Sequence, residues 1–166
     1  MKTIVLGGGC FWCLDAIYKK VEGVTNIESG YAGGNTDSPT YEEVCLGKTG
    51  HAEVVRLSFD ETKIDLKNIL RIFFEVHDPT TMNAQGADIG TQYRSVIFYS
   101  SPEDEIVIRS SIEEAQKNFK NNIVTEVSPL PAFYLAEEYH QDYYAKNPNQ
   151  PYCVAVISPK LEKFLK

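Results

Sequence analysis

The stretch of sequence that indicates most about the fold is Thr3-Ile4-Val5-Leu6-Gly7-Gly8-Gly9-Cys10-Phe11-Trp12-Cys13. The apolar run at its start reads as a short buried strand, the three glycines turn the chain, and a helix begins near Cys10 and extends to about Val21. Backbone N–H groups at a helix start favour an anion, so we expect the thiol of Cys10 to have a lowered pKa. The alternative is that Cys10 is a small buried hydrophobe beside an ordinary turn.

Strands and helices continue to alternate beyond this stretch. We expect strands over 24–31, 52–59, 95–99 and 124–127, and helices over 65–76, 102–118 and 136–145. The side chains of Asp65 and Ser101 are the expected N-caps of the first two helices. This order predicts an α/β or α+β domain with helices packed on a sheet. From Lys146 onward the chain has several prolines and little periodicity, so we expect an aperiodic tail. The polar segment from His77 to Thr91 is long for a connection in a compact domain, which favours a functional role.

Composition narrows the classes of function. The chain has 166 residues, enough for one domain with its own core, and a formal net charge of −7. A negative surface repels phosphate and anionic lipid, so we expect no nucleic-acid or membrane partner. The apolar part of the N-terminus, Ile4 to Leu6, is too short for a signal core. Four cysteines are too few for a disulfide framework, so we predict a cytoplasmic protein.

Cys10 and Cys13 have the spacing of a redox dithiol or of half a zinc site. A zinc site would need Cys45 and His51 to complete four ligands, and their spacing from the first pair is irregular. We therefore expect no metal and no other cofactor. Cys13 is as well explained by packing as by redox chemistry, and both readings stay open.

Glu53 is the most informative acid. Side chains alternate along a strand, which puts Glu53 on the same face as Val55, Leu57 and Phe59. A carboxyl on that apolar face would be desolvated, its pKa would rise, and it would stay protonated near neutrality, as a general acid requires. The alternative is that Glu53, in the first turn of the strand, bends into water.

A second group of polar side chains lies where the long polar segment enters the 95–99 strand. Asp88, Tyr93 and Arg94 supply an acid, a phenol and a guanidinium there, although loop capping explains them equally well. The scattered His51, His77 and His140 favour hydrogen-bonded structural roles.

Five motifs together identify a resemblance that covers the chain from residue 4 to about 160. They occur in the order Gly9-Cys10-Phe11-Trp12-Cys13, Gly50-His51-Ala52-Glu53-Val54, His77-Asp78-Pro79-Thr80, Gly90-Thr91-Gln92-Tyr93-Arg94-Ser95 and Ala136-Glu137-Glu138-Tyr139-His140-Gln141. The chain resembles the A-type peptide methionine sulfoxide reductases, which repair oxidised methionine, each enzyme class acting on one sulfoxide epimer. The resemblance implies a mixed sheet flanked by helices, in a two-layer sandwich with a ferredoxin-like core.

The resemblance also implies roles for named residues. The Cys10 thiolate would attack the sulfoxide sulfur and become a sulfenic acid. Glu53 would protonate the sulfoxide oxygen, assisted by the hydroxyls of Tyr41 and Tyr93.

Three further residues would bind the substrate. Phe11 and Trp12 would hold its S-methyl group, and Asp88 would position the substrate or the proton network. The family's selectivity implies the S epimer of methionine sulfoxide, free or in proteins.

A second thiol must resolve the sulfenic acid as a disulfide, which thioredoxin would reopen. Cys153 matches the family's resolving cysteine and is favoured over Cys13, because a regular helix would hold the Cys10–Cys13 pair poorly for a disulfide. These expectations describe one catalytic domain over residues 1–166, with 146–166 as a mobile tail, that acts as a monomer. The rival reading is a general dithiol–disulfide oxidoreductase that uses Cys10 and Cys13 and needs no Glu53.

Overall fold

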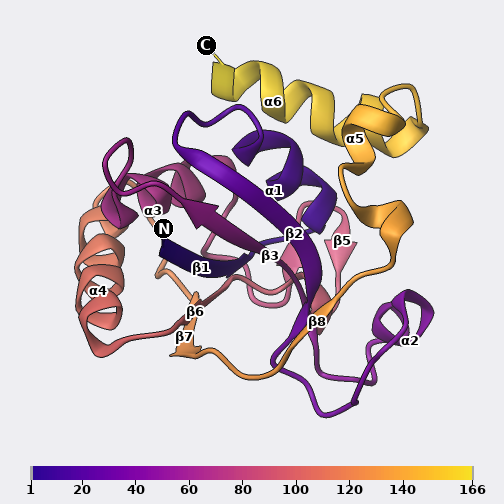
Figure 1. The fold of residues 1–166 in the computed structure, drawn as a ribbon, viewed down its shortest axis with the longest axis horizontal. Coiled ribbons are helices and arrows are strands. Elements are labelled where there is room, and N and C mark those ends of the chain that lie inside the picture. Colours follow the sequence, from indigo (N-terminus) through magenta and orange to yellow (C-terminus); the bar gives the residue numbers. More distant parts are fainter. Residues whose placement is uncertain (1, 166) are drawn as a thin grey trace.

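A single mixed sheet forms the centre of the computed structural model, which describes residues 2–165 (Figure 1). Its strands are β1 (Lys2–Gly7), β2 (Val24–Ala32), β3 (Ala52–Phe59), β6 (Val96–Tyr99), β7 (Glu126–Pro129) and β8 (Phe133–Leu135). They lie in the order β7-β6-β1-β3-β2-β8, and every neighbouring pair is antiparallel except β6 and β7. The short strands β4 (Ala84–Gln85) and β5 (Asp88–Ile89) pair separately.

The inner four strands have ferredoxin-like connectivity. Helix α1 (Phe11–Tyr18) joins β1 to β2, a turn-containing segment leads into β3, and helix α3 (Leu66–Val76) precedes β6. The resulting order β6-β1-β3-β2, with β3 antiparallel to both of its neighbours, is the split βαβ arrangement. The predicted mixed sheet flanked by helices is confirmed.

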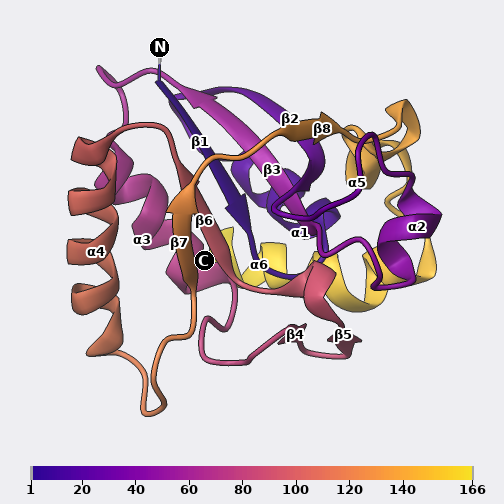
Figure 2. The same ribbon diagram turned by 90° about the horizontal axis from the view of Figure 1, so that it is seen from below.

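Alternation along the strands separates two apolar clusters. Ile4 and Leu57 face the helices and belong to the larger cluster, whereas Val5 and Val54 belong to a smaller cluster on the opposite face. In Figure 2 the helices α1 and α3 lie behind the strands. The face of β3 that carries Glu53 is therefore the face buried beneath α1, as the alternation predicts.

Two helices begin at the predicted caps. The Asp65 side chain accepts a hydrogen bond from the backbone N–H of Asn68 at the start of α3. The Ser101 side chain likewise accepts a hydrogen bond from the backbone N–H of Asp104 at the start of α4 (Pro102–Gln116). Such caps satisfy N–H groups that have no partner within the helix. A third helix, α2 (Tyr41–Cys45), carries a capping box formed by Thr40 and Glu43.

The structure corrects the expected helix over 136–145. Backbone N–H of Ala136 bonds to Ser29 O on β2, and the chain then forms the 3₁₀ turn η2 (Glu138–His140) and the short helix α5 (Tyr143–Lys146). Asp142, with φ of 55°, separates the two. Tertiary hydrogen bonds hold this segment against the sheet and outweigh its helical pattern. The strand expected over 124–127 lies two residues later, as β7.

The structure also corrects the expected aperiodic tail. Residues Cys153–Ile157 form a π-helix, η3, which continues into α6 (Ser158–Leu165). Cys153, Ile157 and Leu161 are buried at intervals of four residues, which is the stripe of a helix packed on one side. Pro159 lies within this continuous helical run, directly after the π-turn, and because it has no N–H it cannot donate a hydrogen bond to the preceding turn. The helices pack on α1, and none between Lys2 and Leu165 is long and apolar enough to span a bilayer.

Candidate active site

Cys10 lies at the N-cap of α1, directly after a glycine turn. Gly9 has φ of +84°, a conformation that favours glycine, and its N–H bonds to Tyr93 O at 3.1 Å. A Cβ on Gly8 would stand only 2.8 Å from the His77 ring, so this position also requires glycine. The turn leaves the Cys10 side chain at 6% exposure, beneath the aromatic side chains that follow it.

Glu53 meets Cys10 from the first turn of β3. Its side chain is 1% exposed, and Oε1 accepts a hydrogen bond of 3.1 Å from the Phe11 backbone N–H. The Cys10 thiol is near enough to this carboxyl for each group to shift the pKa of the other. Oε2 is buried and has no partner among the described residues. The interpretation that Glu53 bends into water is wrong.

Burial is the main cause of the protonation state of Glu53. Desolvation raises its pKa to about 8, and the nearby Asp88 adds to the rise, against the lowering effect of the Phe11 N–H and of Cys10. Glu53 is therefore a neutral acid at pH 7, with a proton available at an oxygen that has no other partner.

The expected lowering of the Cys10 pKa is wrong. Desolvation raises the pKa of the Cys10 thiol well above its ordinary value, and charge on Glu53 or Cys13 would raise it further. The backbone N–H of Trp12 does favour the thiolate, as a helix start should, but it does not offset the burial. The free protein therefore holds a protonated thiol beside a protonated carboxyl.

Tyr41 and Tyr93 stand near this pair. Burial raises the pKa of both phenols, and the charge of Glu53 is the next cause for each, so both remain protonated donors. Tyr41 begins α2, and its ring stacks over Phe11 with the centroids 6.4 Å apart. Tyr93 lies in the 3₁₀ turn η1 (Thr91–Tyr93), whose backbone holds Gly9.

An aromatic wall continues from Phe11 and Trp12. The Trp12 ring stacks on Tyr143 at 3.8 Å between centroids, and its Nε1–H donates to Nδ1 of His140 at 3.0 Å. His140 is fully buried, so its ring is an internal support of the wall. The sequence predicted a hydrogen-bonded structural role for His140 and placed Tyr143 within the helix expected over 136–145, so neither residue was expected at the site.

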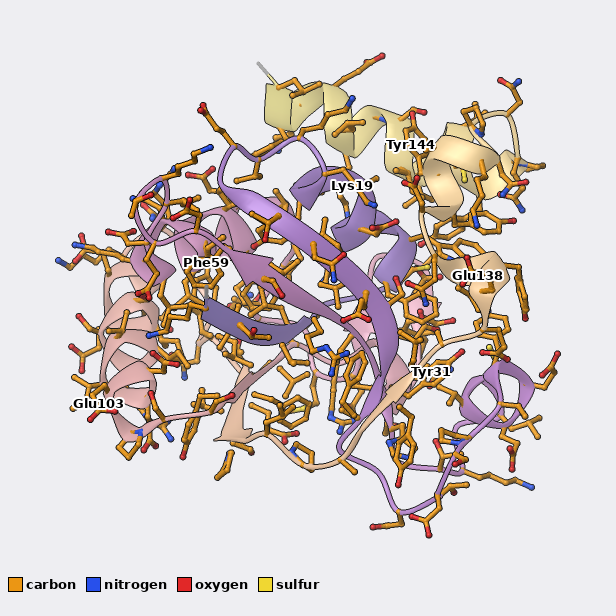
Figure 3. All side chains as sticks on the ribbon, viewed as in Figure 1. Lys19, Tyr31, Phe59, Glu103, Glu138 and Tyr144 are labelled. Atoms are coloured by element: carbon orange, nitrogen blue, oxygen red, sulfur yellow. The ribbon has the colours of Figure 1, made fainter. Side chains whose placement is uncertain are left out.

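Two polar side chains fix the segment that carries this wall. Glu137 accepts hydrogen bonds from the Tyr31 hydroxyl at 2.8 Å and from the Tyr41 backbone N–H at 2.9 Å. The Gln141 amide bonds to both the N–H and the carbonyl of Ser29 on β2, as a neighbouring strand would. Figure 3 shows Tyr31, which lies on β2, and Glu138 on the same side of the molecule. Glu137 precedes Glu138 in the chain.

Asp88 joins the site through Tyr152. The Tyr152 hydroxyl donates to Asp88 Oδ2 at 2.5 Å and lies 3.9 Å from Cys13 Sγ. The ring stands edge-on to Trp12. Sequence reasoning missed Tyr152, and the one signal that could have drawn attention to it was its place directly before Cys153.

All four cysteines are free thiols in the structure. Cys13 and Cys153 are buried in the packing between α1 and the C-terminal helices, and Cys153 is inaccessible to solvent. Cys45, at the end of α2, is exposed.

The remaining histidines have structural roles. His51 accepts a hydrogen bond from the Gly34 N–H at Nδ1 and donates one to Thr36 O from Nε2. His77 donates from Nδ1 to Phe73 O and accepts at Nε2 from Ser95. In the part of the chain that the structure describes, no cluster of His, Cys, Asp and Glu side chains is arranged to hold a metal ion.

Arg94 lies at the strand mouth but away from the reacting groups. Its guanidinium binds Glu126 and the carbonyls of Gly50 and Thr91. It therefore anchors loops around the site.

Known proteins match this chain over nearly its whole length. The family described as "Peptide methionine sulfoxide reductase" matches residues 2–166. A "Peptide methionine sulfoxide reductase MsrA" from an Arthrobacter species (strain FB24) is 58% identical over 163 residues, which cover 98% of this chain and 94% of the relative.

Solved structures agree with the sequence matches. The reduced form of Mxr1 from Saccharomyces cerevisiae superposes with a TM-score of 0.86 and is 42% identical, over 90% of this chain and 87% of the yeast chain. A structure of Mxr1 in complex with Trx2 is also similar, with a TM-score of 0.62 and 28% identity over 86% and 84% of the two chains.

Proposed function

This chain belongs to the peptide methionine sulfoxide reductase family, and from that premise we propose that Cys10 is its nucleophile and Glu53 its general acid. The protein is an oxidoreductase that reduces methionine sulfoxide to methionine and so repairs oxidative damage. The observation that carries the assignment is that Cys10 and a neutral Glu53 carboxyl are buried together at the start of α1, where Glu53 Oε1 accepts a hydrogen bond from the backbone N–H of Phe11, the residue after Cys10.

Reduction of the sulfoxide moves one oxygen atom to Cys10 and uses two proton transfers. The sulfoxide oxygen takes the proton of Glu53 as Cys10 Sγ forms a bond to the substrate sulfur, and the thiol proton passes to the carboxylate that Glu53 leaves. The hydroxyl then transfers to Cys10 Sγ while the bond between the two sulfurs breaks. Methionine departs, Cys10 becomes a sulfenic acid, and Glu53 is again protonated. Without protonation the sulfoxide oxygen is a poor leaving group, so the neutral carboxyl provides the main acceleration.

Neighbouring side chains have supporting roles in this scheme. Tyr41 and Tyr93 donate hydrogen bonds to the sulfoxide oxygen, since burial keeps both phenols protonated. Phe11 and Trp12 form an apolar wall for the S-methyl group. Asp88 orients the Tyr152 hydroxyl, with which it shares a short hydrogen bond, and acts on the proton network through its charge.

Cys153 resolves the sulfenic acid in our proposal. Its thiol attacks Cys10 Sγ, a disulfide forms, and water leaves. Cys13 is the less suitable resolving thiol, because it lies one turn along α1 from Cys10 and its side chain is directed towards Tyr152. A thioredoxin dithiol then reduces the disulfide, and the similarity to Mxr1 in its complex with Trx2 supports that reductant.

The proposal also covers the epimer selectivity, domain organisation, oligomeric state and cellular location of the protein. We assign selectivity for the S epimer, free or in proteins, a single catalytic domain over residues 1–166 and action as a monomer. Residues 146–166 move during resolution, because Cys153 must leave its buried position. Four free thiols and a thioredoxin reductant suit the cytoplasm, where thiols are kept reduced.

The rival function is a general dithiol–disulfide oxidoreductase that uses Cys10 and Cys13, and the two functions make different demands on Glu53. Disulfide exchange has no use for a neutral acid beside the attacking thiol, whereas sulfoxide reduction requires one. Incubation with a dipeptide containing methionine S-sulfoxide and dithiothreitol separates them. Formation of the thioether supports reductase function, and disulfide exchange on proteins without thioether formation would reject it.

A further inference from the structure

The two ring nitrogens of His140 have different surroundings. Nδ1 lies 3.0 Å from the indole Nε1 of Trp12, whereas Nε2 is buried without a partner among residues 2–165. An indole N–H can only donate, so Nδ1 is the acceptor and the proton of the neutral ring is on Nε2. Burial lowers the pKa of His140, against the charges of Glu137 and Glu42, so the ring is neutral at pH 7 and able to accept.

We propose that His140 is a positioning residue, which fixes the Trp12 indole through Nδ1 and thereby limits the size of the S-alkyl group that the pocket accepts. This inference rests on the function proposed above, in which Phe11 and Trp12 hold the S-methyl group. It adds a role in specificity for a residue that acts through Trp12 and not on the substrate itself.

Two contacts on the Trp12 indole restrain different movements. The Tyr143 ring stacks on it with the centroids 3.8 Å apart and the planes within 6°, which opposes a tilt of the indole out of its plane. Such a stack still allows the indole to slide within that plane. The hydrogen bond to His140 depends on the direction of the N–H, so it restrains the sliding that the stack permits.

His140 is a fixed acceptor because its neighbours in sequence are tied to the sheet and to α2. Its backbone N–H bonds to Glu137 O within the turn η2. The Glu137 carboxylate accepts from the Tyr31 hydroxyl on β2 and from the Tyr41 backbone N–H on α2, and the Gln141 side chain pairs with the backbone of β2. Strand β2 pairs in turn with β3, which carries the proposed acid. The acceptor nitrogen therefore has a fixed place relative to the reacting groups.

The place of the indole determines the room for the S-alkyl group. In the proposed scheme the substrate sulfur bonds to Cys10 while its oxygen takes a proton from Glu53, so both atoms are fixed and the alkyl group lies against Phe11 and Trp12. An ethyl group adds one methylene. A fixed wall excludes this methylene and a wall that slides admits it, and one methylene in an apolar pocket changes kcat/KM by about 10–200-fold.

The N-acetylated S-sulfoxides of methionine and ethionine test this role. The measured quantity is the ratio of kcat/KM for the two substrates with dithiothreitol as reductant, in which changes to the shared chemistry cancel. We expect the unsubstituted enzyme to prefer the methyl substrate by about tenfold or more. His140→Leu, which removes the acceptor, should bring the ratio close to one, and His140→Asn, whose amide oxygen can replace Nδ1, should restore much of the preference.

Trp12→Phe separates a role through Trp12 from a general effect on the fold. Phenylalanine has no N–H to donate, so His140→Leu should change the ratio no further in that background. His51→Leu is the matched control, because that buried histidine binds the Gly34 N–H and faces the Tyr134 ring instead, and it should keep the preference for the methyl substrate.

The role is rejected by a ratio near one in the unsubstituted enzyme, by an unchanged ratio in His140→Leu, or by a further change when His140→Leu is added to Trp12→Phe. Nitrogen-15 NMR of the unsubstituted protein decides the matter if the leucine variant does not fold. Trp12 is the one tryptophan of the sequence, so its indole N–H gives a single cross-peak, and Nδ1 of His140 should have the chemical shift of an unprotonated acceptor. A protonated Nδ1 would overturn the proposal. Because this measurement needs no turnover, it remains valid if the unsubstituted enzyme reduces neither sulfoxide, a result that would instead reject the proposed function.

Discussion

The backbone N–H of Phe11 donates a hydrogen bond to Oε1 of Glu53 across 42 positions of sequence. The contact ties the first turn of α1 to the start of β3, so the acid is held beside the residue that precedes Phe11, the proposed nucleophile Cys10. It occupies one carboxyl oxygen and leaves the other, Oε2, without a partner among residues 2–165. One oxygen is therefore used for orientation while the other faces the reaction.

Glu53→Gln should lower kcat/KM for methionine S-sulfoxide by about 10²–10⁴-fold, because the amide keeps the shape of the side chain and loses its acidic proton. The matched control is Glu61→Gln, at an exposed position in the turn after β3, which should match the unsubstituted enzyme. A rate within a few-fold of normal for Glu53→Gln would reject the general-acid role.

The alkaline limb of the pH profile should also depend on Glu53. Its pKa is about 8, so the protonated fraction of the free enzyme, and with it kcat/KM, should fall about tenfold per pH unit above that value. The profile is measured from pH 6 to 10 with dithiothreitol in excess. An unchanged alkaline limb in Glu53→Gln would assign that ionisation to another group.

Cys10→Ser should abolish turnover, since a serine hydroxyl at neutral pH is too weak a nucleophile for the sulfoxide sulfur. Cys45→Ser makes the same change at an exposed thiol and should retain turnover. Production of methionine over several cycles by Cys10→Ser would refute its assignment as nucleophile.

Cys153→Ser should yield about one methionine per enzyme and then stop with thioredoxin as reductant, because the sulfenic acid forms but no disulfide follows. Product is counted in a single-turnover experiment, and the stalled sulfenic acid is trapped with a carbon nucleophile and located by mass spectrometry. Normal thioredoxin-driven cycling would transfer the resolving role to Cys13.

Acid should destabilise the protein through His77. Burial lowers its pKa to about 4 from an ordinary 6.5, so between these values the unfolded chain binds more protons than the folded one. The free energy of unfolding should therefore fall as the pH falls through this window, by about 3 kcal/mol in total. Urea titrations at pH 7 and pH 4 measure the change, and His77→Asn should reduce it even if that variant is less stable at both values.

Local patterns predicted much of the fold and the central pair of the site. Alternation in β3 was sufficient to bury Glu53, because reversing the strand would have exposed Val55, Leu57 and Phe59. The side-chain caps of Asp65 and Ser101 marked helix starts within a residue, since capping depends on nearest neighbours in sequence.

The errors share a cause, which is dependence on contacts distant in sequence. The segment 136–145 has a helical pattern, yet Gln141 and Glu137 bind partners on β2 and α2 that no local rule can identify. The dipole argument for Cys10 was sound for an exposed helix start. It failed because Cys10 is buried, and the sequence around Cys10 does not show which distant elements cover it.

Tyr152 and Cys153 are consecutive residues, so one peptide unit separates the partner of the Asp88 carboxylate from the thiol that we propose as the resolving one. In that proposal, any displacement of Cys153 towards Cys10 also displaces Tyr152, whose hydroxyl would then leave Asp88. Closing the disulfide would thus alter the polar side of the pocket that had just released its product.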